Sequence, residues 1–127
     1  MSEFTDAVIF IVRQVPYGTV ASYGQIAAYT GVARAARQVG WTLNRIEGEV
    51  EVPWWRIVNN VGRISIKNTK FNTPMLMKQM LEYEGLEISS DYTFDIEKYR
   101  FRPSVDQMKA WQLDDEYIER VCKRYLV

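Results

Sequence analysis

The sequence has no histidine, and Cys122 is its one cysteine among 127 residues. Without an imidazole the chain lacks the usual general base, the usual metal ligand and the histidine partner of a nucleophilic serine or cysteine. A single cysteine also excludes a disulfide within the chain. Most of the familiar catalytic constellations are therefore missing, and we expect neither a cofactor nor a bound metal ion.

Long apolar runs are missing too. No stretch approaches the roughly 18 apolar residues of a membrane span, and no basic leader precedes an apolar stretch at the N-terminus. Apolar residues nevertheless make up 47% of the chain and charged residues 25%, which suits one compact domain with a sizeable core. We expect an intracellular protein, cytoplasmic and nucleoid-associated in a prokaryote or nuclear in a eukaryote.

The charges cancel overall, with 16 basic and 16 acidic residues, but they are unevenly distributed. The excess of basic residues lies in one stretch and consists of Arg34, Arg37, Arg45, Arg56, Arg63, Lys67 and Lys70. Its acidic residues, Glu47, Glu49 and Glu51, sit together in one predicted loop. Such a stretch is typical of a nucleic-acid surface, although a solvated charged face produces the same pattern.

Helix signals near the N-terminus predict a helix-turn-helix. A first amphipathic helix begins after the N-cap Ser2, a second begins after Ser22, and Gly31 supplies a tight turn before a third that starts near Ala33. In the third helix the predicted inward stripe is Ala35 or Ala36, Val39, Leu43 and Ile46. The predicted outer face carries Arg34, Arg37, Gln38, Trp41, Asn44 and Arg45. An arginine-rich exposed helix face is what a DNA-binding helix needs.

The middle of the chain predicts a small β-hairpin, with strands over 55–58 and 63–66 and a turn over 59–62. A helix follows from Thr73 to Gly85, with Leu76, Met80 and Leu81 facing inward. Further helices are expected between 104 and 127. The predicted fold is mainly α with a small β-hairpin: a winged helix-turn-helix domain over 1–100 and a helical extension over 101–127 packed on it.

Three motifs together carry a resemblance to a known family. They are Tyr23, Ala35-Ala36-Arg37-Gln38-Val39-Gly40, and Pro53-Trp54-Trp55-Arg56-Ile57-Val58-Asn59 followed by Gly62. In this order and spacing they resemble the C-terminal domain of the O6-alkylguanine-DNA alkyltransferases, over residues 4 to 90. In that family the alkyl-accepting cysteine lies in a Pro-Cys-His-Arg segment. The chain is therefore similar to the alkyltransferase-like proteins, which typically carry Pro-Trp-His-Arg, and it departs from them at Trp55.

The replacement of cysteine by Trp54 and of histidine by Trp55 argues against an enzyme. Dealkylation needs a thiolate to attack the alkyl carbon, with a histidine and a glutamate to generate it, and an indole does neither. Glu84 matches the family's glutamate, and we expect it to be a structural hydrogen-bonding or capping residue here. Cys122 lies outside the resemblance, where a small buried apolar role is the favoured interpretation.

The resemblance implies roles for individual residues in docking to the minor groove and flipping a nucleotide. Arg37 matches the arginine inserted into the base stack, and Tyr23 matches the tyrosine that crowds the phosphate and helps turn the nucleotide out. Arg34 and Trp41 are expected to touch phosphates or sugars, with Arg45 and Arg63 as less specific candidates.

The same resemblance implies a pocket for the lesion base. Trp54 is expected to line its floor, together with Tyr23, Pro53 and Ile57, and Lys67 stands where alkyltransferase-like proteins present an arginine to the lesion. Lysine lacks the planar fork of arginine, so lesion preference is expected to differ. Further residues are interpreted as supports, with packing favoured over binding for Trp55 and with turn or bracing roles for Arg56, Asn59, Asn60 and Gly62.

The favoured hypothesis is a non-enzymatic sensor of O6-alkylguanine in double-stranded DNA, which marks the lesion for nucleotide excision repair as the resemblance implies. An alternative is a winged helix-turn-helix transcription regulator that reads the major groove with the same arginines. A third, an enzyme that uses Cys122 or the carboxylates, is disfavoured because no partner base is visible.

Overall fold

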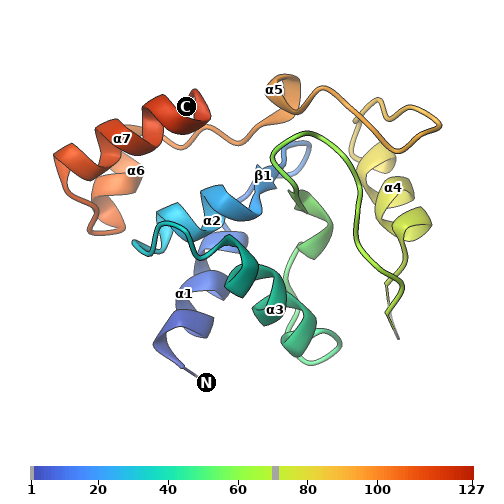
Figure 1. Ribbon diagram of the computed structural model, residues 1–127, viewed down its shortest axis with the longest axis horizontal. Coiled ribbons are helices and arrows are strands. Elements are labelled where there is room, and N and C mark those ends of the chain that lie inside the picture. The colour runs from blue at the N-terminus through green and yellow to red at the C-terminus, as the bar shows by residue number, and fades with distance from the viewer. Residues whose placement is uncertain (1, 70–71) are drawn as a thin grey trace.

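Figure 1 shows the computed structural model, which describes residues 2–69 and 72–127. Helices dominate this part of the chain, and strands are few and short. In chain order the elements are α1 (Glu3–Val12), β1 (Ala21–Ser22), α2 (Tyr23–Tyr29), α3 (Ala36–Ile46), the 3₁₀ turn η1 (Trp54–Arg56), β2 (Ile57–Val58), α4 (Pro74–Tyr83), α5 (Ile96–Tyr99), α6 (Val105–Ala110) and α7 (Asp115–Tyr125). Among the described residues, no helix has both the length and the apolar character that a membrane crossing requires.

The helix-turn-helix is confirmed, and its ends follow from local hydrogen bonds. The Ser2 side chain accepts from the Thr5 amide at the start of α1, and Ser22 and Gln25 form a reciprocal capping box at the start of α2. Gly31 has a φ of 89°, which an L side chain rarely adopts, and it lets the chain turn between α2 and α3.

The start of α3 differs from the prediction. The helix begins at Ala36 rather than near Ala33, and Arg34 precedes it with a left-handed φ of 71°. Val39, Leu43 and Ile46 face the core as expected, and the buried Thr42 extends that stripe. Arg34 is therefore presented by the turn before α3 and not by the helix itself.

The predicted hairpin is wrong. The two-stranded sheet joins β1 to β2 in parallel, with Ala21 paired to Ile57 and Ser22 to Val58. The residues before β2 form η1 instead of extending the strand, because the Arg56 amide bonds to the Pro53 carbonyl. The returning segment pairs elsewhere, with an antiparallel bridge between Arg63 and Thr93.

The turn after β2 explains why residues 63–66 leave β2. The Asn59 side-chain carbonyl accepts from the amides of Val61 and Arg63 and bends the chain back on itself. The chain then lies against residues 92–94, where the Phe94 amide bonds to the Gly62 carbonyl at 2.9 Å. Asn59 and Gly62 are thus structural supports, as the sequence indicated.

Helix α4 begins and ends as predicted, with Thr73 as its N-cap, Pro74 in its first turn and the positive-φ Gly85 just after its end. Its inward face differs from the prediction at one position, where Met77 replaces Leu76. Met77 is buried and Leu76 is 36% exposed, while Leu81 is buried as expected.

The core has two parts. The larger joins α1, α2 and α3 to the C-terminal helices, and the smaller lies between the sheet, α4 and the segment that leads to α5. Helix α7 packs against α2, where the Tyr117 hydroxyl donates to the Ala28 carbonyl at 2.6 Å. Figure 1 shows α6 and α7 on one side of the molecule and α4 on the other, with α3 between them.

Candidate nucleic-acid interface

The outer face of α3 and the turn before it present exposed basic and aromatic side chains. Arg37 is exposed, and Trp41, one turn further on, is 59% exposed. Within the part of the chain that the structure describes, the guanidinium groups of Arg34 and Arg37 make no hydrogen bond or ion pair. By contrast, Arg45 donates to the Thr5 hydroxyl at 2.8 Å and is partly committed to the fold.

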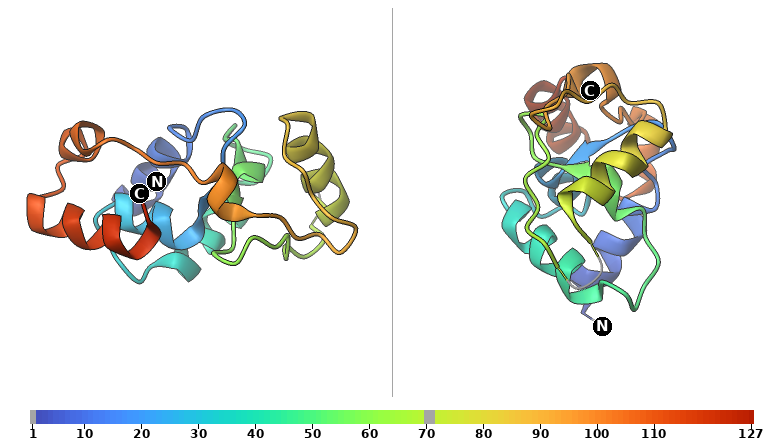
Figure 2. Two further views of the ribbon diagram at one scale, coloured as in Figure 1. Left: turned by 90° about the horizontal axis from the view of Figure 1, so that it is seen from above. Right: turned by 90° about the vertical axis from the view of Figure 1, so that its right-hand side faces the viewer.

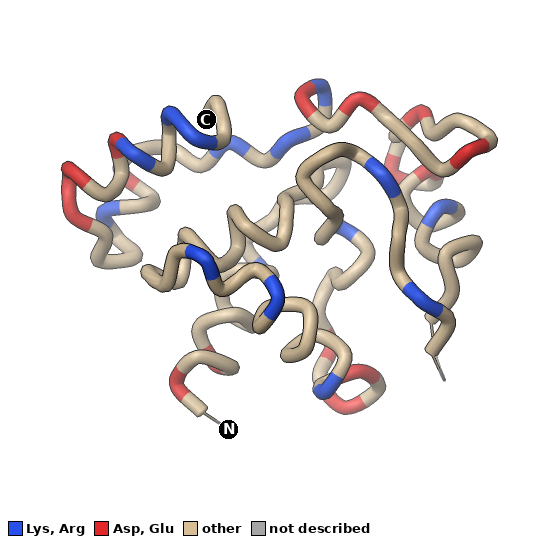
Figure 3. Tube along the Cα trace, in the orientation of Figure 1, with Lys and Arg blue, Asp and Glu red and all other residues tan. Residues whose placement is uncertain are grey.

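The basic residues gather on the face that α3 shares with the segment after β2. Figure 3 shows blue positions along α3 and along this segment, which carries Arg63 and Lys67. Red positions lie in the loop 47–51 at the end of α3, on the segment from α4 to α5 and where α6 meets α7. Lys70, the last residue of the basic stretch, lies outside the described residues. A chain with no net charge therefore has a locally basic face.

A cavity of about 170 Å³ opens beside this face, between α3 and the segment after β2. It brings together three of the predicted pocket residues, Tyr23, Trp54 and Lys67, although they are far apart in the sequence. Burial raises the pKa of the Tyr23 phenol above its ordinary value. The hydroxyl therefore stays protonated at neutral pH, where it is able to donate a hydrogen bond.

Several lining residues were not predicted from the sequence for this role. They are Gly40, Leu43, Asn44, Ile66, Thr69 and Asn72. Gly40, Leu43 and Asn44 are spaced by three and four residues along α3, so they share one helix face, and that spacing was the available signal. Thr69 and Asn72 follow β2 on an irregular segment, where no periodicity points to them.

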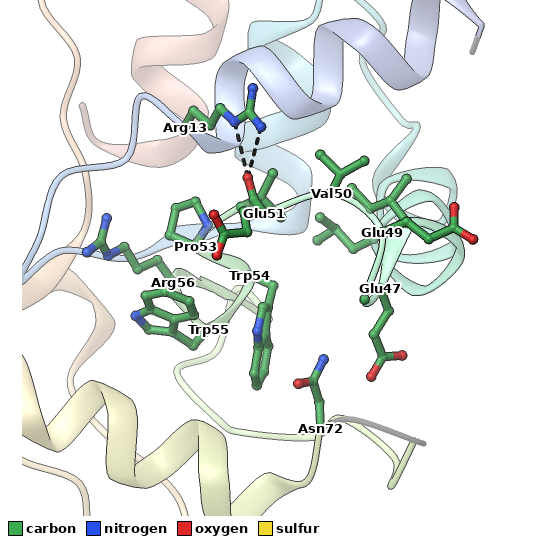
Figure 4. A pocket seen from close by; sticks show the side chains of 14 residues that line it. Arg13, Glu47, Glu49, Val50, Glu51, Pro53, Trp54, Trp55, Arg56 and Asn72 are labelled. Atoms are coloured by element: carbon green, nitrogen blue, oxygen red, sulfur yellow. Dashed lines mark hydrogen bonds between the residues drawn. The ribbon is translucent and has the colours of Figure 1, made fainter.

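A second and larger cavity, of about 740 Å³, lies on the other side of Trp54. Leu43, Trp54 and Asn72 line both cavities, so they form the partition between them. Figure 4 shows Trp54 extending toward Asn72, with the acidic loop 47–51 beside it. The Arg13 guanidinium at the end of α1 donates twice to the backbone carbonyl of Glu51 in this loop, at 2.9 and 3.2 Å.

Two predicted pocket residues lie elsewhere. Pro53 lines the larger cavity and not the smaller one. Ile57 was expected in the pocket wall, but its side chain is fully buried in β2 and belongs to the core. Ile57 pairs with Ala21 in the parallel sheet, and this is the pairing that stands in place of the predicted hairpin.

Glu84 at the end of α4 ties the Pro53–Arg56 segment to the rest of the fold. Its carboxylate accepts from the Trp55 indole at 2.6 Å, from Arg56 at 2.9 to 3.1 Å and from the Gly18 amide at 2.8 Å. Burial alone would raise the pKa of Glu84, but the hydrogen bonds from Arg56, Gly18 and Trp55 bring that pKa below its ordinary value. Glu84 is thus the structural hydrogen-bonding residue that the sequence indicated.

Trp55 takes part in this network in a way that packing alone did not predict. Its indole N–H donates to Glu84, and its ring stands edge-on to Trp54 with 6.0 Å between ring centroids. The Arg56 guanidinium lies over the Trp55 ring, 5.4 Å from its centroid, and also donates to the Val15 carbonyl. Trp55 therefore holds Trp54 in place by both a ring contact and a hydrogen bond to the fold.

The cavity walls offer no nucleophile of the kind that alkyl transfer needs. Neither cavity beside Trp54 is lined by a cysteine. Cys122 lies on α7, on the side of the molecule away from α4, and is partly buried against the larger core. Across residues 2–69 and 72–127, no group of acidic or cysteine side chains is arranged to hold a metal ion.

Comparisons of the sequence with known proteins agree on one family. Residues 3–86 match the family described as the DNA-binding domain of 6-O-methylguanine DNA methyltransferase. Alkyltransferase-like protein 1 of Schizosaccharomyces pombe is 36% identical over 107 residues, which cover 81% of this chain and 98% of that protein. The DNA base-flipping protein of Vibrio parahaemolyticus is 34% identical over 103 residues, covering 81% of this chain and all of that protein.

A solved structure agrees with these sequence matches. The chain is similar to Schizosaccharomyces pombe Atl1 in a complex with damaged DNA that contains O6-carboxymethylguanine, with a TM-score of 0.73 and 36% identity. That match covers 81% of this chain and 98% of Atl1. The mainly helical fold with its small sheet is therefore the fold of these neighbours.

Proposed function

Because the chain belongs to the alkyltransferase-like proteins, within the family of the 6-O-methylguanine DNA methyltransferase DNA-binding domain, we propose that it is a non-enzymatic sensor of O6-alkylguanine in duplex DNA. It binds through the helix-turn-helix, turns the damaged nucleotide out of the duplex and leaves the alkyl group in place. The observation that carries this proposal is the cavity lined by Tyr23, Trp54 and Lys67, which opens beside the exposed arginines of α3.

Arg37 is suited to occupy the space that the flipped nucleotide leaves. Its guanidinium is exposed on α3 and carries five donors, so it is able to bond to the orphaned partner base. Unstacking and unpairing a base costs a few kcal/mol, and such a bond offsets part of that cost. Arg34 and Trp41 flank Arg37 on the same surface and serve to position the phosphate backbone.

Trp54 gives the proposed pocket a flat apolar wall against which an alkylated guanine stacks. It stands in the place of the family's acceptor cysteine, and Trp55 stands in the place of the histidine. An indole has no lone pair suited to attack an alkyl carbon, so the protein retains the lesion without repairing it. We propose that the bound complex marks the lesion for nucleotide excision repair.

Lys67 is the proposed specificity residue of the pocket. Its ammonium is a compact charge, where the relatives' arginine has a planar fork, so it favours lesions with one strong acceptor over those read by two parallel hydrogen bonds. Readout of a base sequence in the major groove does not require a pocket beside the helix, and the relatives reported above do not favour a transcription regulator.

The test is an equilibrium titration at fixed salt against matched duplexes that differ by guanine or O6-methylguanine at one position. We expect tighter binding to the lesion, and we expect Arg37→Ala and Trp54→Ala each to weaken it by about tenfold. Arg120→Ala, which removes one exposed arginine from α7, is the matched control and leaves the preference unchanged. Equal affinity for both duplexes would overturn the proposal.

A further inference from the structure

A groove of about 400 Å³ lies between the loop before β1 and the C-terminal half of α4. Its walls include Tyr17, Trp55, Met80 and Tyr83, and the surface that it exposes is largely apolar. Tyr17 is 60% exposed and Tyr83 is 84% exposed. Two large aromatic side chains thus stand in solvent next to each other, which is uncommon for a surface without a partner.

The groove is already formed, and its two charged side chains, Arg56 and Glu84, are paired with each other. The Tyr17 hydroxyl donates to the Tyr83 carbonyl at 3.2 Å, which joins the two walls. Arg56 lies 5.7 Å from the centroid of the Tyr17 ring and forms its ion pair with Glu84. What the groove offers a ligand is therefore aromatic and apolar surface.

Between Lys78 and Lys98, the segment that leads from the groove toward α5 is acidic. Residues 79–97 contain six carboxylates and no lysine or arginine; the six are Glu82, Glu84, Glu87, Asp91, Asp95 and Glu97. Glu82 and Glu87 are exposed, and Figure 3 shows this segment as a run of red positions. Because this segment carries a net negative charge, it attracts a cationic partner more readily than a phosphate.

The groove also faces away from the nucleic-acid surface. In the left view of Figure 2 the loop before β1 lies at the upper edge and α3 lies at the lower edge. A ligand in the groove therefore leaves the outer face of α3 free, and DNA and the ligand are able to bind at the same time.

We propose that this groove docks a short segment of another protein, one that carries arginine or lysine beside an apolar or aromatic anchor. The anchor fills the space between Tyr17 and Tyr83, and the cation lies over an aromatic face, where the exposed Glu82 beside Tyr83 draws it. This proposal concerns a different surface from the one that binds the lesion, and it applies to the protein free of DNA. Its test is therefore independent of the test of the proposed function.

The test is selection of random 12-residue peptides on the purified full-length protein, followed by affinity measurement on the enriched peptides. We expect the enriched peptides to combine a basic residue with an apolar or aromatic neighbour. Tyr83→Ser weakens their binding about tenfold, since the ring forms one wall of the groove. Glu82→Gln weakens it about two- to threefold at low salt, since it removes the exposed charge beside Tyr83.

Two matched variants separate the groove from general surface effects. Phe10→Ser removes a half-exposed aromatic ring from α1, and Glu116→Gln removes an exposed carboxylate from α7, and both leave peptide affinity unchanged. Enrichment of acidic or uncharged peptides, binding that survives Tyr83→Ser, or no enrichment at all would each overturn the proposal.

Discussion

Replacement of Glu84 by glutamine tests whether the Pro53–Arg56 segment is held by the network described above. The Glu84 side chain is 4% exposed, and that of its partner Arg56 is 15% exposed, so the ion pair is largely shielded from water. Glutamine keeps one carbonyl acceptor, but its amide group would face donors from Arg56 or Trp55. The substitution therefore leaves a buried guanidinium without its counter-charge.

The expected cost is about 3 kcal/mol in the free energy of unfolding. Loss of one partner from a buried pair costs about 3–5 kcal/mol, and we take the low end because the remaining carbonyl and the Val15 carbonyl still accept from Arg56. For comparison, Glu87→Gln removes an exposed carboxylate that lies 4.0 Å from Lys98, and such a pair contributes about 0–1 kcal/mol.

The assay is urea unfolding of the two variants and the parent protein, followed by tryptophan fluorescence. Because the pKa of Glu84 is lowered in the folded protein, its stabilisation is present above its unfolded pKa and is lost as the pH falls through the folded pKa. The parent should therefore lose stability below about pH 4.5 more steeply than Glu84→Gln. The reasoning would be refuted if Glu84→Gln and Glu87→Gln had the same urea midpoint. It would also be refuted if the parent protein and Glu84→Gln lost stability equally steeply as the pH falls.

Three further predictions follow from local geometry. Gly62→Ala should destabilise the protein by about 3 kcal/mol or more, because Gly62 has a φ of 75° and a Cβ there would lie 2.3 Å from the Phe94 carbonyl oxygen. The control Gly85→Ala, where no atom lies within 4 Å of the added Cβ, should cost about 1 kcal/mol in the same urea assay. Trp55→Phe should cost about 1.5–3 kcal/mol, because it removes the hydrogen bond from the indole to Glu84; an unchanged unfolding midpoint would contradict this. Burial raises the pKa of Tyr29 to about 12, so stability should fall as the pH rises from the ordinary tyrosine pKa of 10.0 toward that value, and Tyr29→Phe should flatten this alkaline decline in unfolding experiments.

Helix positions were predictable from the sequence because their signals are local. Ser2, Ser22 and Thr73 each accept a backbone hydrogen bond within three residues, and Gly31 and Gly85 adopt positive φ just after helices. The start of α3 was misplaced because Arg34 occupies a left-handed conformation, which nothing in its residue type requires.

Strand pairing was not predictable, because it joins residues far apart in the sequence. The 57–66 pattern favours a hairpin, but Ile57 and Val58 pair with Ala21 and Ser22 instead. The side-chain amide of Asn59 decides this by bending the chain away from β2. The misplacement of Ile57 in the pocket wall has the same cause.

The predicted site shows the same difference between what the sequence indicates and what only the tertiary contacts decide. The resemblance supplied Tyr23, Trp54 and Lys67, which the structure brings to one cavity. Thr69 and Asn72 reach that cavity only through the packing of α3 against the segment after β2, and they carry no signal of their own in the sequence. Their placement needed the tertiary structure.

The central claim is recognition of the lesion without its removal. The most direct measurement incubates the protein with a duplex that carries one O6-methylguanine labelled in its methyl group, and it follows complex formation and the location of the label together. We predict a stable complex, preferred over the guanine duplex, with all of the label recovered in the DNA. Label transferred to the protein, to Cys122 or to any other residue, would contradict the account.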